Sequence, residues 1–418
     1  MSLRRSLLSV TCLGVALSFS TVALAKDEQA AQMGVADKKA EEYNAKGVRL
    51  GSFNLFPKVT VKQTHNDNIY KEKQNTSDDW ITDIEPSLSL RSDWNQHSLR
   101  FDGKANIGRY ADYGDNDYED YELRARGTLD ASKALTVKGD AKFKHGHEDR
   151  GGDDVGSDAK NPVESDTINT QVDVKYKPNR LGLQFTADYD IIDIDDNQTT
   201  AGGTTNNDDR DRRDVEGTLK VSYELKKGYE AYLKGSLNDR NYDDATDDNG
   251  VNRDSDGYKA QAGIAIDLSK LVRADIAAGY MSQDYTDNSL KDASGWSGDV
   301  DVSWFATPLT TVRGKVGRSI DETTTSGVSS TVGTKYGIGV DHEFLRNLRA
   351  SADIKLSKSD YEGGTRKDDK TNYIAKIDYK LNRNFFAGAS VDFEERDSNE
   401  DTNDYDKTTF MIKIGAQF

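Results

Sequence analysis

The last nine residues of the chain alternate between two kinds of side chain and end on a phenylalanine. Phe410, Ile412, Ile414, Ala416 and Phe418 share one face, and the residues between them share the other. A period of two predicts a β-strand with one apolar and one polar face. A chain built from such strands folds either as a soluble sandwich, which buries the apolar face, or as a transmembrane barrel, which turns that face to lipid.

The same alternation runs from Phe53 to the C-terminus, and its strands are joined by two kinds of connection. Eight short connections are expected at Trp94-Asn95-Gln96-His97, Ser132-Lys133, Lys177-Pro178-Asn179-Arg180, Lys227-Gly228, Ser269-Lys270, Thr307-Pro308, Arg346-Asn347 and Asn382-Arg383-Asn384. Nine longer ones, rich in Asp, Asn, Gly and Thr, include residues 153–165, 195–212, 242–256 and 396–406. We therefore predict an all-β fold, a transmembrane antiparallel up-and-down β-barrel of about 18 strands over residues 49–418, with its short turns in the periplasm.

The apolar face of these strands carries almost no charge. Val215, Gly217, Leu219, Val221, Tyr223 and Leu225 are predicted to face lipid, while Glu216, Lys220 and Glu224 face inward. A Lys or Arg at mid-bilayer on the lipid side would cost about 2–4 kcal/mol, so this regular absence favours the membrane barrel over the sandwich. A soluble periplasmic β protein remains the alternative.

Composition alone would suit a soluble or partly disordered protein, because 31% of the residues are charged and the net charge is -17. No mature segment is apolar enough for a membrane helix, but barrels tolerate such polarity since only alternate residues meet lipid. Arg4 and Arg5 precede an apolar run that closes on Ala23-Leu24-Ala25, which predicts a cleaved signal peptide at residues 1–25. The one cysteine, Cys12, lies in that segment, so no disulfide is expected.

Residues 26–48 are rich in Ala, Lys, Glu and Gln. They predict a short helical or flexible extension in the periplasm without a role in the pore, the alternative being a plug folded into the lumen.

The inward positions carry charges of both signs, unevenly distributed along the chain. The predicted basic lining residues are Arg91, Arg100, Lys104, Arg124, Arg126, Lys138 and Lys142, and the predicted acidic ones are Asp188, Asp190, Glu216, Asp267, Asp275, Asp299 and Asp301. On opposing walls they would set a transverse field that orients polar solutes. The alternative is that they pair across neighbouring strands, as Asp102 with Arg124, and only solvate the wall.

Other chemistry has little support in the sequence. Inward aromatic residues are sparse, mainly Phe56, Tyr110, Tyr232 and Phe386, so a sugar-stacking path is not indicated. Asp-rich loops, such as the one with Asp243, Asp244, Asp247, Asp248, Asp254 and Asp256, lack the spacing of a calcium hand, and His145 with His147 lack a third metal ligand. We expect no metal, no cofactor and no enzymatic activity, and net acidity argues against nucleic-acid binding.

The opening strand Leu50-Gly51-Ser52-Phe53-Asn54-Leu55-Phe56-Pro57-Lys58-Val59-Thr60-Val61, followed by His65-Asn66-Asp67-Asn68-Ile69-Tyr70, resembles that of the β-barrel porins found with exopolysaccharide synthesis and export systems. This resemblance implies an outer-membrane channel that helps polysaccharide leave the cell, often beside a periplasmic export protein. The alternatives are a general diffusion porin and a non-conducting structural or interaction barrel with acidic surface loops.

The expected partners are outer-membrane lipid, lipopolysaccharide and the barrel assembly machinery. The C-terminal strand, with Phe410, Ile412, Ile414 and Phe418, is expected to act as the signal for that machinery.

Overall fold

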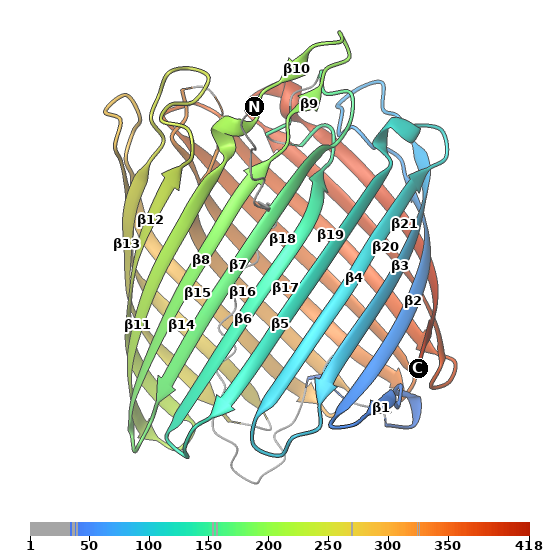
Figure 1. Ribbon diagram of the computed structural model, residues 1–418, viewed down its shortest axis with the longest axis vertical. Helices are drawn as coiled ribbons and strands as arrows, with labels where there is room; N and C mark the ends of the chain where they lie inside the picture. The colour runs from blue at the N-terminus through green and yellow to red at the C-terminus, as the bar shows by residue number, and fades with distance from the viewer. Residues whose placement is uncertain are drawn as a thin grey trace, which may run out of the picture.

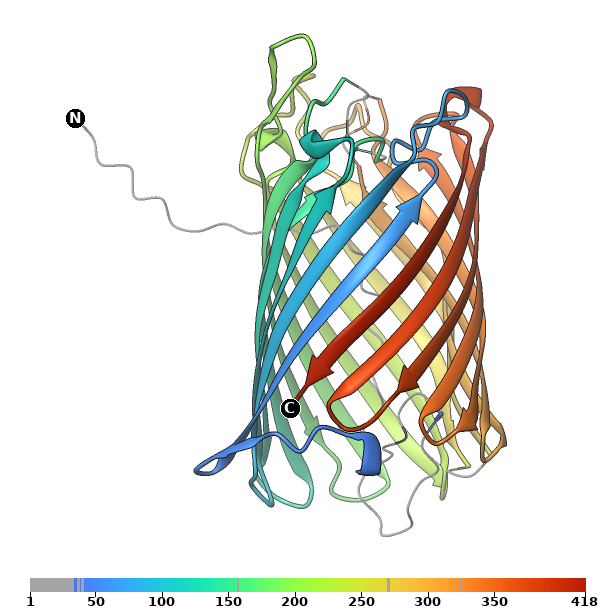
Figure 2. The same ribbon diagram turned by 90° about the vertical axis from the view of Figure 1, so that its right-hand side faces the viewer.

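The alternating runs fold into a closed barrel of strands 13 to 16 residues long (Figure 1, Figure 2). The computed structural model describes residues 34–35, 38, 41–152, 154–155, 158–268, 271–323, 325 and 327–418. The barrel strands are β2 (Phe53–Asn66), β3 (Asp79–Ser92), β4 (Ser98–Tyr110), β5 (Tyr118–Asp130), β6 (Leu135–Glu148), β7 (Val163–Tyr176), β8 (Leu181–Ile194), β11 (Arg212–Lys226), β12 (Tyr229–Tyr242), β13 (Ser255–Asp267), β14 (Val272–Tyr285), β15 (Ala293–Thr307), β16 (Thr310–Glu322), β17 (Ser330–Leu345), β18 (Leu348–Glu362), β19 (Lys367–Lys380), β20 (Phe385–Ser398) and β21 (Tyr405–Gln417).

Each barrel strand pairs antiparallel with its neighbours in sequence, and β2 closes the ring against β21 from Lys58–Gln417 to Asn66–Thr409. The prediction of an antiparallel barrel of 18 strands is confirmed. Short turns lie at one end of the barrel, together with the C-terminus, and the long loops lie at the other (Figure 1). The turn at Ser269-Lys270 lies outside the described residues.

The remaining elements are short. They are β1 (Val48–Leu50), which pairs with the start of β2, the small sheet of β9 (Asn197–Gln198) and β10 (Thr204–Thr205), and the 3-10 turns η1 (Glu41–Tyr43), η2 (Gly114–Asn116), η3 (Asp208–Arg210) and η4 (Asp401–Asn403). Loop boundaries moved accordingly: the loop expected at 153–165 spans 149–162, and that expected at 195–212 contains β9, β10 and η3. In the described part of the chain, no helix is long and apolar enough to cross a membrane.

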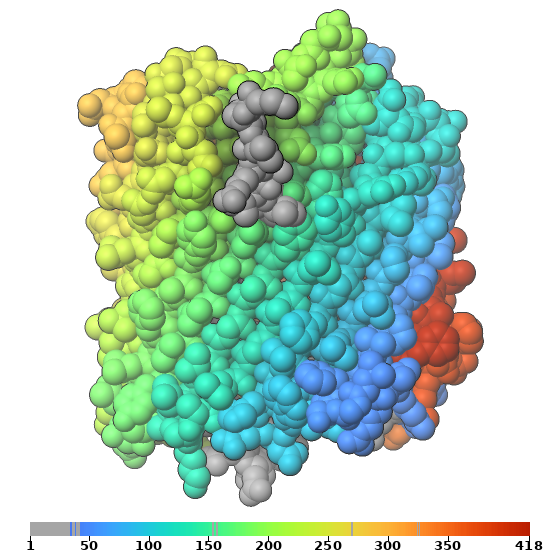
Figure 3. All heavy atoms as spheres, in the orientation of Figure 1, coloured from blue at the N-terminus to red at the C-terminus, as the bar shows by residue number. Residues whose placement is uncertain are grey.

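Apolar side chains cover the outside of the wall. Leu219, Leu233, Leu237 and Ile414 are among the most exposed, at 51%, 65%, 71% and 65% of their surface. The polar residues that alternate with them therefore face the lumen. Side chains close the outer face between neighbouring strands, as the space-filling view shows (Figure 3).

The extracellular ends of β16 and β17 depart from this alternation. The β15–β16 ladder stops at Asp299–Gly317, whereas β16 and β17 stay paired up to Glu322–Ser330. Ile320, on the lipid-facing parity of β16, is buried in a cluster with Met281 of β14. The upper part of this hairpin therefore leans into the barrel.

The N-terminal segment lies against the inner wall at the short-turn end. Val35 is almost fully buried, and its N–H donates to the Oγ1 of Thr311 on β16 at 3.0 Å. The sequence predicts a short helical or flexible periplasmic extension at residues 26–48, with a plug in the lumen as the alternative, and no polarity pattern distinguishes the two. Residues 1–33, including the predicted signal peptide, lie outside the described residues.

Candidate functional site: the barrel lumen

The predicted basic residues lie on the lumenal face of β3 to β6, and most of them are paired. Arg91, Arg100 and Arg126 occupy one row across three strands. Asp102 accepts hydrogen bonds from Arg100 at 2.8 Å and from Arg126 at 2.6 Å. The arginine row is therefore partly neutralised inside the wall itself.

The other basic residues divide into paired and free cations. The Nε of Arg124 donates to Asp140 at 2.8 Å rather than pairing with Asp102, its partner in register, and Lys104 lies 3.1 Å from Glu122. Among the described residues, Lys138 and Lys142 have no carboxylate within 4.0 Å.

The predicted acidic residues form two groups on the lumenal face. On β8 and β11, Asp188 and Asp190 accept from the amides of Gln171 and Asn169, both at 2.6 Å, and Glu216 accepts from Thr218. No described cation pairs with these three carboxylates.

On β13 to β15 the carboxylates are matched by cations. Asp299 lies 3.0 Å from Lys259, Asp301 lies 3.3 Å from Lys315, Asp275 lies 3.8 Å from Lys220, and Asp267 lies 3.7 Å from Arg273. Pairing between neighbouring strands thus cancels much of the transverse field. Among the predicted lining residues, those without a described partner of opposite charge are Arg91 on β3, Lys138 and Lys142 on β6, and Asp188, Asp190 and Glu216 on the nearby β8 and β11.

A second basic wall escaped the sequence interpretation. It lies on β18, β19 and β21, and we call its members the basic sector: Arg349, Lys355, Lys376, Lys380 and Lys413. Lys413 pairs with Asp378 at 2.6 Å, but no carboxylate of the described chain lies within 4.0 Å of Lys355 or Lys376. The alternation that places the first set of basic residues on the lumenal face also holds in the last third of the chain. Applied there, it would have identified these residues.

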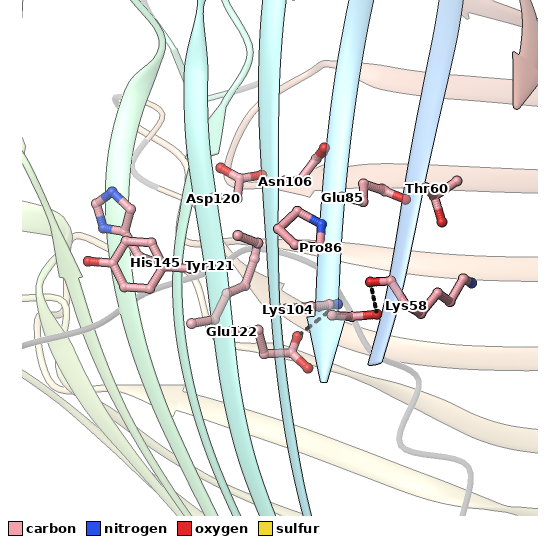
Figure 4. A pocket seen from close by; sticks show the side chains of 13 residues that line it. Lys58, Thr60, Glu85, Pro86, Lys104, Asn106, Asp120, Tyr121, Glu122 and His145 are labelled. Atoms are coloured by element: carbon pink, nitrogen blue, oxygen red, sulfur yellow. Dashed lines mark hydrogen bonds and ion pairs between the residues drawn. The ribbon is translucent and has the colours of Figure 1, made fainter. Parts of the chain in front are cut away.

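A proline, Pro86 of β3, interrupts the barrel wall across the β2–β21 pairing from the basic sector. Pro86 has no N–H to give, and the β3–β4 ladder skips the positions between Ile84–Ile107 and Ser87–Lys104. A hollow of about 300 Å³ lies there, lined by residues that include Lys58, Glu85, Lys104 and Glu122 (Figure 4). Its cations and carboxylates alternate, which suits a hydrated polar surface.

The lumenal aromatic rings are covered by cations. Arg91 lies 4.6 Å over Phe56, Lys58 lies 4.8 Å over Phe386, and Lys220 lies 3.7 Å over Tyr232. Tyr110 also follows the lumenal parity of β4. These rings offer little free surface for stacking against sugars.

Described residues of loop 149–162 contact two sides of the extracellular mouth. Near its start, Arg150 donates to the hydroxyl of Tyr70 in the β2–β3 loop at 3.0 Å. Further along, Asp154 accepts from Thr323, just after β16, at 3.0 Å. Strands β6 and β16 lie on opposite sides of the ring (Figure 1), so this loop bridges the lumen.

Buried arginines hold the neighbouring loops together. Arg253 is 3% exposed; its Nε donates to Asp247 at 2.8 Å, and its Nη1 donates to the carbonyl oxygens of Thr323 and Val328 at 2.7 and 3.1 Å. Arg210, 4% exposed, donates to Glu148 at 2.8 Å. The Asp-rich loop 243–254 is therefore an ordered part of the mouth rather than a loosely hydrated one.

Two loop carboxyls are perturbed in opposite directions. Burial raises the pKa of Asp211 to about 8, with Asp193, Asp208 and Asp243 adding to the effect against a hydrogen bond from the N–H of Ile194. Burial also acts to raise the pKa of Asp149, but the hydrogen bond from His147 and the charge of Lys71 outweigh it and lower that pKa to about 2. The mouth therefore combines a carboxyl that is protonated at neutral pH with one that is fully ionised.

The two histidines considered as a metal pair have separate surroundings. His145 stacks on Tyr121, whereas His147 stacks on Tyr118 at 4.0 Å and contacts Asp120 at 2.7 Å. Across the described ranges, no group of three or more potential ligands is arranged to hold a metal ion.

The chain was compared with known proteins at the level of sequence and of structure. Residues 41–418 match the family model described as putative beta-barrel porin 2. No curated protein matches the sequence.

Among solved structures, Pseudomonas aeruginosa OccK3 (OpdO) has a TM-score of 0.44 and 12% identity, covering 87% of this chain and 95% of its own. The outer membrane protein OpdK of the same organism has a TM-score of 0.45 and 9% identity, and the match covers 87% of this chain and 99% of OpdK. A mutant of the ferric enterobactin receptor PfeA from that organism has a TM-score of 0.47 and 9% identity, and the match covers 90% of this chain and 81% of PfeA.

Proposed function

Because the chain belongs to the putative beta-barrel porin 2 family, we propose that this porin-like channel of the outer membrane passes polar solutes and takes part in the export of exopolysaccharide. Porin-like barrels act as channels rather than as enzymes.

The observation that carries the proposal is the polar lining of a barrel of this size. Charged and amide side chains follow the inward positions of every strand, from the short turns to the mouth. Barrels of 16 to 18 strands enclose an aqueous channel, whereas eight strands leave an interior filled by side chains. A hydrated, charged lumen supports passage of polar rather than apolar solutes.

The polysaccharide role is supported by the resemblance at residues 50–70 and by the character of the lumen. Since the lumenal rings are covered by cations, the wall offers ionic and hydrogen-bonding groups rather than a stacking path. Such a wall suits a charged polymer better than a neutral one. A periplasmic export protein would meet the barrel at its short-turn end.

The membrane partners follow from the outer face. Phe410, Ile412, Ile414 and Phe418 are all about half exposed or more on the lipid side of β21 and at its end. We propose that they contact acyl chains in the folded barrel and the assembly machinery during insertion. Lipopolysaccharide would surround the extracellular end.

Two measurements test the function. Single-channel recording in planar bilayers should show conductance steps, and a deletion strain should secrete less polysaccharide while general uptake of small solutes is unchanged. Conductance steps together with normal polysaccharide secretion in the deletion strain would instead indicate a general diffusion porin.

The second candidate is a non-conducting interaction barrel. The contact between Asp154 and Thr323 favours it, because a loop that spans the lumen can block the mouth. Absence of steps in the recording, with the barrel correctly folded, would select this alternative.

A further inference from the structure

The hollow beside Pro86 lies on the lumenal face, near the middle of β3. Its polar lining residues have the same strand parity as the lumenal residues Arg91, Lys104 and Arg124; they include Glu85, Ser87, Asn106, Asp120 and Glu122. A solute that crosses the lumen therefore passes the hollow midway between the two ends of the barrel.

A break in the ladder between β3 and β4 shapes the hollow. The ladder continues on both sides of the break, at Ile84–Ile107 and at Ser87–Lys104. Pro86 cannot donate a backbone hydrogen bond, so the two strands do not close here. The volume of about 300 Å³ is at the lower end of the range of about 300–1,000 Å³ for small-molecule sites, which suits one sugar unit rather than a longer segment.

The polar residues of the hollow form two rows across adjacent strands. In the row nearer the extracellular mouth, Asn106 is directly opposite Asp120, and Glu85 lies beside Asn106 on β3 (Figure 4). In the other row Lys104 is opposite Glu122, and their charged groups lie 3.1 Å apart. Residues two positions apart on a strand are separated by about 7 Å, so a ring that lies between the rows can bond to both.

The charges of the lining cancel. Three lysines and three carboxylates line the hollow, namely Lys58, Lys104, Lys144, Glu85, Asp120 and Glu122. Two of the carboxylates have further partners outside the lining: Glu85 pairs with Lys62, and Asp120 contacts Nδ1 of His147 at 2.7 Å. A surface balanced in this way does not favour an ion of either sign.

The hollow is rich in hydrogen-bond acceptors. A carboxylate has about four lone-pair sites, and each of the contacts above uses only one oxygen atom of its carboxylate. Asn106 is held by one long hydrogen bond, from Nδ2 to the hydroxyl of Tyr118 at 3.4 Å, and its Oδ1 has no partner among the described residues. Hydroxyl groups can therefore donate to the carboxylates directly, and to Asn106 after a turn of its amide.

We propose that this hollow is a binding site for one neutral sugar unit of a polysaccharide in the lumen, whose hydroxyl groups donate to the carboxylates of both rows. This inference rests on the proposed function, since it gives the channel a recognition site for its polymer. Hydrogen bonds to charged acceptors are stronger than those between neutral groups, so a wall with few free aromatic faces can still hold a sugar. Charged groups of the polymer would be met elsewhere in the lumen.

The class of ligand is tested with mature full-length protein, residues 26–418, folded in detergent. Neutral hexasaccharides of glucose, of galactose and of mannose are titrated and observed by saturation-transfer NMR, beside a polyethylene glycol of matched length. The glycol offers ether acceptors but no hydroxyl donors along its chain. At least one of the three sugars should bind at least about tenfold more tightly than the glycol.

The place of binding is tested by two different changes to the hollow. Pro86→Ala restores the missing N–H, should close the ladder and should weaken the most tightly bound sugar at least about tenfold. Glu85→Gln with Glu122→Gln preserves the shape but removes two charged acceptors and should weaken it by a similar factor.

Each change has a matched control. Pro57→Ala replaces a second strand proline, whose pairing with Leu88 is intact, and Asp188→Asn replaces a lumenal carboxylate outside the hollow. Both should bind the sugar as the wild type does. Heat-modifiable migration on gels verifies that every variant is folded.

The outcomes separate this proposal from the proposed function. No sugar that binds more tightly than the glycol, unchanged binding in either variant of the hollow, or an equal loss in the controls would refute the site. Because binding is measured without ion flow, sugar binding to a folded barrel that shows no conductance steps would refute the proposed function alone. Conductance steps without sugar binding would refute the site alone.

Discussion

The two ends of the barrel are closed by different kinds of contact. At the extracellular end, several loops interlock around guanidinium groups that are almost fully buried, those of Arg210 and Arg253. At the periplasmic end the connections between strands are short turns, and the described residues of the N-terminal segment dock there through hydrogen bonds from Arg349 to the carbonyl of Lys38 and from Lys380 to Asn44. The difference predicts that the outer mouth is more rigid than the periplasmic end.

Carboxylates contribute to the order of the outer mouth. Asp79, the first residue of β3, is buried and accepts from the backbone N–H groups of Ala111, Asp112 and Tyr113 in the β4–β5 loop at 3.0 to 3.2 Å. Carboxylates that accept from backbone N–H groups and buried guanidiniums fix loop conformation. Acidity in a loop therefore does not by itself indicate mobility.

The largest effect is expected from Arg253→Gln. Removing one partner of a buried ion pair costs about 3 kcal/mol, and here it also leaves the carbonyls of Thr323 and Val328 without their donor. The outer mouth should open, raising single-channel conductance and exposing residues 327–329 to protease.

The matched control is Arg213→Gln, since Arg213 pairs with Asp243 at 2.8 Å but both side chains are about half exposed. It should change neither measurement. Protease resistance that is equal in the two variants would contradict the rigid outer mouth.

A selectivity change is expected from Arg124→Glu with Arg126→Glu. The double reversal removes two lumenal cations, leaves Asp140 without its arginine partner and leaves Asp102 with Arg100 alone, so the wall becomes strongly negative. The reversal potential in a salt gradient should shift toward cation preference. An unchanged reversal potential would show that ions do not pass this wall.

A smaller effect is expected from Gly47→Ala, between η1 and β1. Gly47 has φ +73°, and an added Cβ would lie 2.8 Å from the ring of Phe56, so the cost should exceed the 1–2 kcal/mol of a left-handed alanine. Residues 41–46 should be cleaved faster by protease at the periplasmic end.

Gly51→Ala separates crowding from backbone strain, because Gly51 also has a positive φ but has open space around its Cβ position. Residues 41–46 should be cleaved more slowly in Gly51→Ala than in Gly47→Ala. The reverse order would contradict close packing of Gly47 against β2.

The smallest effect is a pH dependence at the outer mouth. Because the pKa of Asp211 is raised to about 8, the folded loop holds a proton that the unfolded chain loses near its ordinary pKa. The stabilisation is complete below that ordinary value and is lost as pH rises through about 8. Protease cleavage of loop 195–211 should therefore accelerate as the pH rises from 6 to about 8 and should change little above that.

Asp211→Asn should make this cleavage independent of pH, while Asp115→Asn, at an exposed position of η2, should leave the dependence intact. A dependence that persists in Asp211→Asn would assign it to another group.

The sequence predicted those parts of the fold that a period of two encodes. Strand number, turn positions and the lipid-facing residues Leu219 and Leu233 follow from local alternation, because each strand must satisfy both lipid and water. Ile320 and His147 could not be placed this way, since they lie where ladders end and the chain turns inward. Their surroundings depend on residues far away in sequence.

The candidate site was predictable in part for the same reason. Alternation puts Arg124 and Asp188 on the lumenal face, but the choice of Asp140 rather than Asp102 as the partner of Arg124 depends on side-chain conformation. The docking of Lys38 beside Arg349 depends on a contact between residues 311 positions apart. No local pattern encodes such a contact.

The point at which β15 and β16 separate limits how far the hydrocarbon region of the membrane can extend along the barrel. Backbone groups without a strand partner cannot face hydrocarbon, so the acyl region must end below Asp299–Gly317 on that side of the molecule. Trp296 lies just above this level, half exposed, with the guanidinium of Arg318 4.7 Å over its ring, as befits the headgroup zone. The outer leaflet should therefore be locally thinned beside β15 and β16.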